Sequence, residues 1–305
     1  MSESARSSVL PGSVDSSRRP KAGSLIITLF GDVISQHGRD VWLGSIIENL
    51  ADFGLNARQI RTAISRLVQE DWLQSEQRGR RSYYSFTDTG RRRFERVANR
   101  IYAGRLPEWN GQWTFVFLSL MESVKRDHLR RELSWQGFGQ ITPGVFIHPS
   151  ANDEVLTEIM TDAAVSEDVV VMRGNTHELT SQAALENTTF RAWKLNETQA
   201  LFEDFCEYFS AELHRATQRS LADAQLFQLR LLVIHEYRRL LLKTTALPRD
   251  LLPVGWPGEK ALEITAALYA HAEAASLRYI ANHFESMSGP IGPVANGYYR
   301  RFRTA

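Results

Sequence analysis

The stretch Gly54-Leu-Asn-Ala-Arg-Gln-Ile-Arg-Thr-Ala-Ile-Ser-Arg-Leu-Val-Gln-Glu-Asp-Trp-Leu73 contains a turn, a helix and the start of a strand. Asn56 is a preferred N-cap residue, because its side chain accepts a hydrogen bond from a free amide of the first turn. We therefore expect the helix to begin at Ala57. Apolar residues then recur at three- and four-residue steps, which gathers on one face Ile60, Ala63, Ile64, Leu67 and Val68.

The opposite face of this helix carries arginine, hydroxyl and amide groups. Its members are Arg58, Arg61, Thr62, Ser65, Arg66 and Gln69. A helix that is buried on one side and polar in this way on the other suits the major groove of DNA, where such groups bond to base edges. A solvated amphipathic helix would show the same periodicity, so the neighbouring segments must decide between the two interpretations.

The segments on either side of the helix favour a DNA-binding unit. A short amphipathic segment precedes it across a glycine turn, and an arginine-rich loop and the alternating Tyr83-Tyr-Ser-Phe86 follow it. This order predicts a winged helix-turn-helix over residues 23–104, with Arg78-Gly-Arg-Arg81 at the tip of the wing. The recognition helix is expected to read DNA through Arg58, Arg61, Thr62, Ser65 and Arg66. At the wing, contacts with phosphates or the minor groove are expected from Arg78, Arg80, Arg81 and Ser82. We also predict that no acidic side chain pairs with the arginines of the wing tip.

Charge is concentrated in this part of the chain. Residues 56–105 contain twelve arginines, no lysine and five acids, a formal charge of +7, whereas the whole chain carries only +1. The remaining residues are therefore acidic overall. This asymmetry predicts a polyanionic partner for the N-terminal domain alone.

Length and composition limit the remaining possibilities. With 305 residues, the chain is expected to form two or three domains. Residues 1–22 are rich in serine and have little to bury, which predicts a disordered tail. Cys206 is the only cysteine, so an internal disulfide is excluded and a reducing compartment fits. No apolar run is long enough for a membrane helix, so we expect a cytoplasmic protein.

Two further domains are predicted after the linker around Gly104. Residues 105–178 show strands and helices in the order βαββαβ, which is typical of a ferredoxin-like fold. Residues 179–305 are mainly helical, interrupted by a proline-rich loop from Leu247 to Gly258. The fold class is therefore α+β multidomain. Helix start signals include Ser24 and Thr87, each expected to cap the helix that follows it.

Signatures of enzymes are absent from the sequence. It contains no phosphate-binding glycine loop, no His-Glu-x-x-His and no Gly-x-Ser-x-Gly, so no catalytic or metal-binding residue and no cofactor is predicted. The alternative is a nucleic-acid-processing enzyme built on the ferredoxin-like domain, which needs a carboxylate at the end of its first strand. Residues 119–121 stand there as Ser-Leu-Met, and Glu122 is the nearest acid.

The chain resembles the PaaX family of transcriptional repressors along nearly its whole length. The resemblance is carried by five stretches in order: Ser24-Leu-Ile-Ile-Thr-Leu-Phe-Gly-Asp32, Arg61-Thr-Ala-Ile-Ser-Arg-Leu67, Gly79-Arg-Arg-Ser-Tyr-Tyr84, Trp135-Gln-Gly-Phe-Gly139 with Pro143-Gly144, and Leu251-Leu-Pro-Val-Gly-Trp-Pro-Gly258. It implies a middle domain similar to the Cas2 fold and a C-terminal helical domain. It also implies a homodimeric repressor of phenylacetate breakdown, released from double-stranded operator DNA by an aryl-acetyl-coenzyme A such as phenylacetyl-coenzyme A.

Such an effector requires basic side chains at one end of its pocket and an aromatic wall at the other. Cations lie near aromatic residues in the C-terminal domain, and the candidates for effector binding are Arg238, Arg239, Lys243, Trp256 and Lys260. Each of these places, where a cation lies near an aromatic residue, fits equally well a surface cation that rests on an aromatic ring at the edge of a core.

Overall fold

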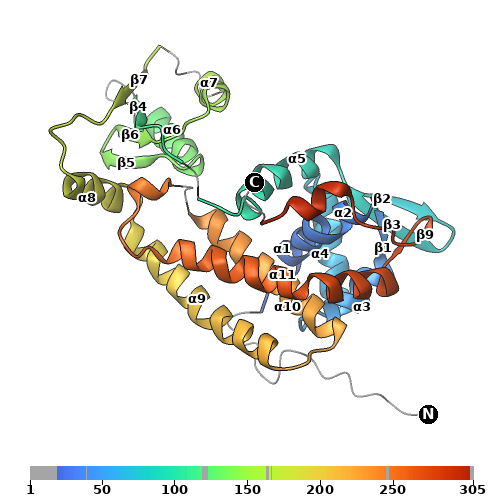
Figure 1. The fold of residues 1–305 in the computed structure, drawn as a ribbon. Helices are drawn as coiled ribbons and strands as arrows, with labels where there is room; N and C mark the ends of the chain where they lie inside the picture. Colours follow the sequence, from blue (N-terminus) through green and yellow to red (C-terminus); the bar gives the residue numbers. More distant parts are fainter. Residues whose placement is uncertain are drawn as a thin grey trace. The chain divides into compact units, whose positions relative to one another are not determined.

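The computed structural model describes residues 19–302, except 39, 107, 119–122, 163–164, 166 and 245–246. The predicted tail lies almost wholly outside these residues, as does the Ser-Leu-Met-Glu segment relevant to the enzyme alternative. The described chain forms two compact units, and Figure 1 labels most of their helices and strands. Unit 1 takes its residues from Met1–Gly104, Phe205–Arg239 and Ala261–Ala305, and unit 2 from Arg105–Asp204 and Leu240–Lys260.

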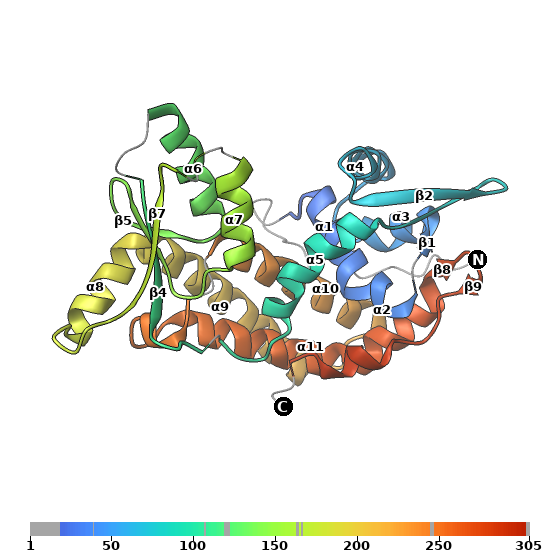
Figure 2. The same cartoon turned by 90° about the horizontal axis from the view of Figure 1, so that it is seen from above.

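The N-terminal part of unit 1 combines short helices with a three-stranded antiparallel sheet of order β1-β3-β2. Its elements are α1 (Ala22–Leu29), the π-helix η2 (Phe30–Ile34), α2 (Ser35–His37), β1 (Asp40–Trp42), α3 (Leu43–Ala51), α4 (Ala57–Gln69), β2 (Leu73–Arg78), β3 (Arg81–Phe86) and α5 (Asp88–Ile101). Strands β2 and β3 form an elongated hairpin that extends past α4 (Figure 2). Its turn lies at Gly79, where φ is +62°.

Two of the three predicted helix caps are confirmed. The Asn56 side chain accepts from the Gln59 amide at the start of α4, and the Gln59 side chain accepts in return from the Asn56 amide. Thr87 caps α5 by accepting from Gly90. The prediction for Ser24 is wrong, because α1 begins earlier, at Ala22, with Lys21 as its N-cap. Ser24 therefore lies within the first turn of the helix.

Unit 2 contains the predicted βαββαβ order, with its sheet arranged as β5-β6-β4-β7 and all neighbours antiparallel. The elements are β4 (Gln112–Phe117), α6 (Ser123–Trp135), β5 (Gly139–Thr142), β6 (Val145–His148), α7 (Asp153–Asp162) and β7 (Val170–Asn175), followed by α8 (Gln182–Ala192). As the apolar run at 112–119 predicted, β4 is a central strand.

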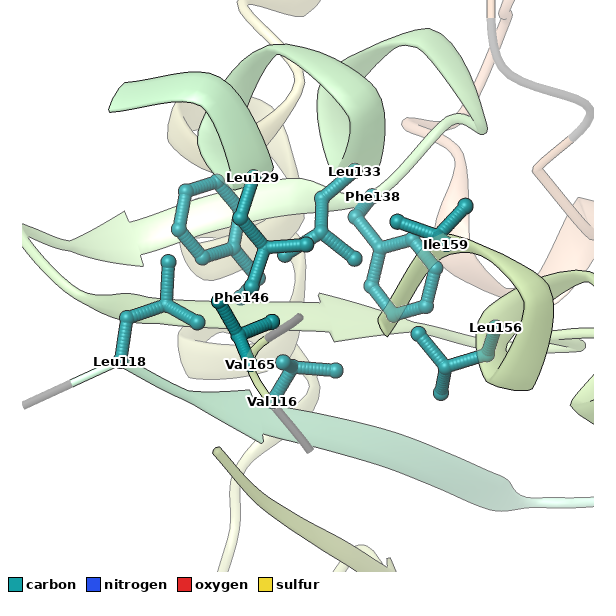
Figure 3. Close-up of a cluster of buried hydrophobic side chains, with 9 residues drawn as sticks. All are labelled: Val116, Leu118, Leu129, Leu133, Phe138, Phe146, Leu156, Ile159 and Val165. Atoms are coloured by element: carbon teal, nitrogen blue, oxygen red, sulfur yellow. The ribbon is translucent and has the colours of Figure 1, made fainter. Parts of the chain in front are cut away.

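The sheet of unit 2 buries side chains on both of its faces. On one face, Val116 and Phe146 pack with Leu129 and Leu133 of α6 and with residues of α7 (Figure 3). On the other face, Trp113 and Ile147 pack against Leu251, with Trp193 at the edge of the cluster. Alternation along β4 explains this division, because successive strand residues point to opposite sides.

The C-terminal region is helical, as predicted. It comprises α9 (Leu195–Gln218), α10 (Asp223–Lys243), the 3-10 turn η3 (Arg249–Leu251), α11 (Pro257–His283), the short strands β8 (Glu285–Ser286) and β9 (Gly289–Pro290), and the 3-10 turn η4 (Asn296–Arg300). Each long helix contributes residues to both units, so the compact units and the predicted boundaries at 104 and 178 divide the chain differently. Among the described helices, none is both long and apolar enough to cross a membrane.

Candidate nucleic-acid interface and the contacts behind it

Helix α4 exposes one polar face and buries the other. Ile60, Ile64 and Leu67 are buried on its inner side. The predicted DNA-reading residues are all exposed on the outer side: Arg58, Arg61, Thr62, Ser65 and Arg66. The structure thus brings the five predicted residues together on one solvent-facing surface, which we call the α4 face.

One arginine of the α4 face has an acidic neighbour. The Arg66 Nε donates to Oε1 of Glu70, one turn further along, at 2.6 Å. Both side chains are exposed, so this pair contributes little to stability and leaves the guanidinium able to exchange one anion for another. A phosphate or a guanine edge can therefore compete for Arg66.

The β2–β3 hairpin places three arginines around its turn. Arg78 pairs across the hairpin with Arg81, and Arg80 lies between them beside Gly79; all three arginines are exposed. Ser82 is half-buried on β3. The predicted wing residues therefore lie together at one end of an elongated ribbon.

The short β8–β9 hairpin holds two of these arginines. Arg81 Nη1 lies 2.5 Å from Oε2 of Glu285, and Arg78 Nη1 donates to the Met287 carbonyl at 2.9 Å. The Met287 amide in turn donates to Asp40 of β1 at 2.6 Å. The expectation that the hairpin tip lacks paired acids is therefore wrong, because the acid comes from a strand more than 200 residues away in sequence.

Unit 1 also contains a buried ionic cluster, centred on Asp32 in η2. Its carboxylate has no exposed surface and accepts from Tyr102 (2.7 Å), Arg301 (2.7 Å), Arg230 (2.9 Å) and Tyr269 (3.2 Å). Tyr102 directly follows α5, Arg230 lies in α10, Tyr269 lies in α11, and Arg301 directly follows η4. The ion pairs and hydrogen bonds of this cluster therefore connect the N-terminal helices of unit 1 to its C-terminal helices.

The surroundings of Asp32 keep it ionised. Burial alone would raise its pKa, but the positive charges of Arg230 and Arg301 outweigh burial and hold the pKa below the usual value. The Arg230 guanidinium also lies 4.4 Å from the centre of the Tyr269 ring, and that of Arg301 lies 4.0 Å from the Tyr102 ring. The aromatic rings thus stabilise the second positive charge that a single carboxylate cannot balance.

Asp32 was missed as a central residue in the sequence interpretation. The available signal is one acid within the apolar helix 25–34, since a buried carboxylate must find a cation. The identity of its partners is not readable from the sequence, because they lie roughly 70 to 270 residues away along the chain.

Helix α10 also packs on α1 within unit 1. His235 Nδ1 lies 3.1 Å from the Thr28 hydroxyl, and burial lowers the pKa of His235 to about 3. Arg238 is buried, with its Nη1 3.4 Å from the Ser24 hydroxyl, and burial lowers the pKa of its guanidinium to about 10. These contacts give Arg238 a place in the packing of unit 1.

The five candidates for effector binding are not gathered into one described site. Arg238 and Arg239 belong to unit 1, whereas Lys243, Trp256 and Lys260 belong to unit 2. The Arg239 guanidinium is bound by both carboxylate oxygens of Glu236, at 3.0 and 2.8 Å. Trp256 packs edge-on against Phe202, while both lysines are exposed.

Comparison with known proteins gives matches over most of the chain. Residues 21–90 match the family described as PaaX-like protein, residues 106–186 match the PaaX protein central Cas2-like domain, and residues 193–282 match the PaaX-like protein C-terminal domain. The transcriptional repressor PaaX of Escherichia coli (strain K12) is 32% identical over 281 residues, which cover 92% of this chain and 89% of that protein. The chain belongs to the PaaX family.

The PaaX assignment covers both parts of the candidate interface, since the match over residues 21–90 contains the α4 face and the β2–β3 hairpin. The unit 2 sheet lies within the Cas2-like match. A solved structure, the uncharacterized protein Rv0674 from Mycobacterium tuberculosis, shares the fold with a TM-score of 0.50 at 19% identity, covering 84% of this chain and 99% of that one.

Proposed function

We propose that this PaaX-family chain is a transcriptional repressor and not an enzyme, and that it binds double-stranded operator DNA through an N-terminal winged helix-turn-helix. The observation that carries the proposal is the α4 face, where all five predicted reading residues are exposed on a helix whose other side is buried. In this assignment α3, the turn at Gly54 and α4 form the helix-turn-helix, and the β2–β3 hairpin is the wing.

Membership of the PaaX family supports a proposal about which genes are regulated and which ligand releases the repressor. We propose that the protein acts in the cytoplasm. We propose that it represses genes of aromatic acid catabolism, chiefly those for phenylacetate breakdown. The inducing ligand is an aryl-acetyl-coenzyme A such as phenylacetyl-coenzyme A, and no cofactor is required. For release, the thioester must bind the DNA-free form more tightly than the DNA-bound form.

A homodimer is part of the proposal, because one recognition helix reads only a few base pairs. Two copies on a two-fold axis place two such helices roughly 34 Å apart, or a multiple of that distance, along the DNA. From the sequence we assign the contact between the two copies to the middle or the C-terminal domain, without a choice between them.

Strand β7 supports the middle domain as the place of this contact. It is an edge strand of its sheet, and Val170 and Met172 are 53% and 55% exposed beside the rings of Phe115 and Phe117 on the paired strand β4. An open edge with exposed apolar side chains is a template for pairing with another strand. Antiparallel pairing of β7 with the same strand of a second copy would satisfy the edge and bury these side chains.

Footprinting on the protein's own upstream region, with a panel of acyl-coenzyme A compounds, tests the function directly. We expect protection of two half-sites that is lost when phenylacetyl-coenzyme A is added. Incubating the protein with labelled DNA and a divalent metal distinguishes a repressor from a nucleic-acid-processing enzyme. Cleavage of the DNA would exclude a pure repressor. Sequence-specific retardation of the DNA in a gel without metal would exclude the enzyme.

A further inference from the structure

Unit 2 contains a cavity of about 860 Å³ between α6, β5 and the end of α8. Its size falls within the range of pockets that hold small ligands and cofactors. The wall carries three cations, Arg130, Arg131 and Lys194, and one acid, Glu132. We call it the α6–α8 cavity.

An indole ring forms the aromatic wall of the α6–α8 cavity, and the backbone holds it in place. Trp193 Nε1 donates to the Gly137 carbonyl at 2.8 Å. A Cβ atom added at Gly139 would lie 2.7 Å from the indole, so only glycine permits this close approach. The Trp135-Gln-Gly-Phe-Gly139 motif thereby acquires a physical role, because its two glycines fix the position of Trp193.

Lys194 has a backbone conformation that is unusual for its residue type. It follows α8 with φ at +49°, in the left-handed region. Helices commonly end on glycine in this conformation, since any Cβ atom is disfavoured there. A lysine at this position costs stability relative to glycine, and such costs concentrate at functional sites.

The cavity has an excess of positive charge that its surroundings do not balance. The Arg130 Nη2 atom lies 3.6 Å from the carboxylate Oδ1 of Asp127. Arg131 Nε donates to the backbone carbonyl of the same residue. Among the described residues, no ion pair joins Arg131 or Lys194 to an acid. An anionic ligand can therefore bind these two cations without first displacing a carboxylate.

We propose that the α6–α8 cavity binds the nucleotide end of an acyl-coenzyme A, with the purine packed against Trp193 and the phosphates bound by Arg131, Lys194 and Arg130. Aromatic side chains provide a stacking surface for bases, and cations bind phosphate through charge-assisted hydrogen bonds. The inference rests on the proposed function, because it assigns to the effector a site that none of the five sequence-based candidates occupies.

The decisive measurement is calorimetry on the full chain with three probes: phenylacetyl-coenzyme A, phenylacetyl-pantetheine, which lacks the nucleotide, and adenosine 3′,5′-bisphosphate. Arg131→Gln and Lys194→Gly are each expected to weaken phenylacetyl-coenzyme A and the bisphosphate by about tenfold, the effect of losing one charge-assisted contact. Binding of phenylacetyl-pantetheine is expected to stay unchanged. Arg126→Gln, on the same helix but outside the cavity wall, is the matched control and should bind all three probes as the wild type does.

The Lys194→Gly variant distinguishes an effect on ligand binding from an effect on the stability of the fold. Because glycine tolerates the left-handed conformation, the variant should unfold at a temperature equal to or above that of the wild type while it binds the nucleotide less tightly. Lowered thermal stability together with unchanged nucleotide affinity would show that Lys194 is purely structural and would overturn its assignment.

The possible outcomes distinguish a failure of the proposed cavity site from a failure of the proposed repressor function. Wild-type affinity for phenylacetyl-coenzyme A in both variants would overturn the cavity and leave the repressor intact. Absence of bisphosphate binding to the wild type would also overturn the cavity. Without ligand, the variants should bind operator as tightly as the wild type does; weaker DNA binding would mean that these cations contact DNA and would equally overturn the proposal. Wild-type protein that binds the bisphosphate but no operator would instead contradict the proposed function.

Discussion

Arg81 of the β2–β3 hairpin and Glu285 of β8 form an ion pair with 2.5 Å between Nη1 and Oε2. A side chain that would meet DNA phosphates is thereby neutralised by the C-terminal region of the same compact unit. The pair is exposed on both sides, so phosphate can replace the carboxylate. Operator binding and the position of the β8–β9 hairpin are consequently linked through this arginine.

Replacing Glu285 with glutamine is predicted to strengthen DNA binding. The change frees Arg81 from a competing acid, so affinity should rise and the plot of log affinity against log salt should steepen by up to about one unit, the effect of one added phosphate contact. Fluorescence anisotropy over a salt series measures both quantities. Glu207→Gln, an exposed position on α9, controls for the change in net charge. Identical slopes for the wild type and Glu285→Gln would show that Arg81 makes no phosphate contact.

Arg61→Ala and Arg66→Ala are predicted to lose operator recognition while the protein stays folded. Both side chains are exposed, and a bidentate arginine–guanine contact contributes about 1–3 kcal/mol of discrimination between bases. Competition of operator against unrelated DNA measures this discrimination, and Arg126→Ala is the control. Wild-type preference for operator in both variants would mean that α4 does not read the sequence.

Asp32→Asn is predicted to destabilise the protein by about 3–5 kcal/mol at neutral pH, because two buried guanidinium groups lose their anion. The pKa of Asp32 is lower in the folded chain than that of an ordinary aspartate, so the unfolded chain binds the proton more readily. The stabilisation is therefore fully present above about pH 4 and is lost as pH falls through the folded-state pKa.

Urea denaturation of the wild type and Asp32→Asn between pH 7 and pH 2.5 measures this stabilisation. The difference in unfolding free energy should be constant down to about pH 4 and shrink below it. Asp250→Asn, at an exposed position, should show no comparable difference at any pH. A difference that is small at pH 7 would contradict the assignment of Asp32 as the anion that holds the helices of unit 1 together.

Met172→Glu in β7 is predicted to shift the protein from dimer to monomer, because a charge is expensive to bury in a strand-to-strand contact. Sedimentation at micromolar concentration gives the oligomeric state. Leu242→Glu places the same charge at another exposed apolar residue and should leave the dimer intact. If the β7 variant also remains a dimer, the contact lies elsewhere, with the C-terminal helices as the other candidate.

The local elements of this fold follow from nearby residues, which explains why sequence predicts them well. The N-cap at Asn56, the cap at Thr87 and the periodicity of Ile60, Ile64 and Leu67 all act within a few residues. Ser24 shows the limit of such rules, because serine is also common inside the first turn, and here the helix begins two residues before it.

The interactions that tie distant segments together were not predictable in the same way. Asp32 binds Arg301 and Arg81 binds Glu285, each across more than 200 residues, and no local pattern selects these partners. The exposed face of α4 was predictable because helical periodicity determines it. Trp193 and Lys194 escaped notice because the glycines that hold the indole lie more than 50 residues earlier in the chain.

Reciprocal coupling between operator DNA and thioester is the most direct test of an effector-released repressor. Calorimetric titration of phenylacetyl-coenzyme A into the wild-type protein, with and without saturating operator, gives the two affinities to compare. We predict that operator weakens thioester binding by the same factor by which the thioester weakens operator binding, as linkage requires. Equal thioester affinity in both titrations would contradict it and would mean that this ligand is not the inducer.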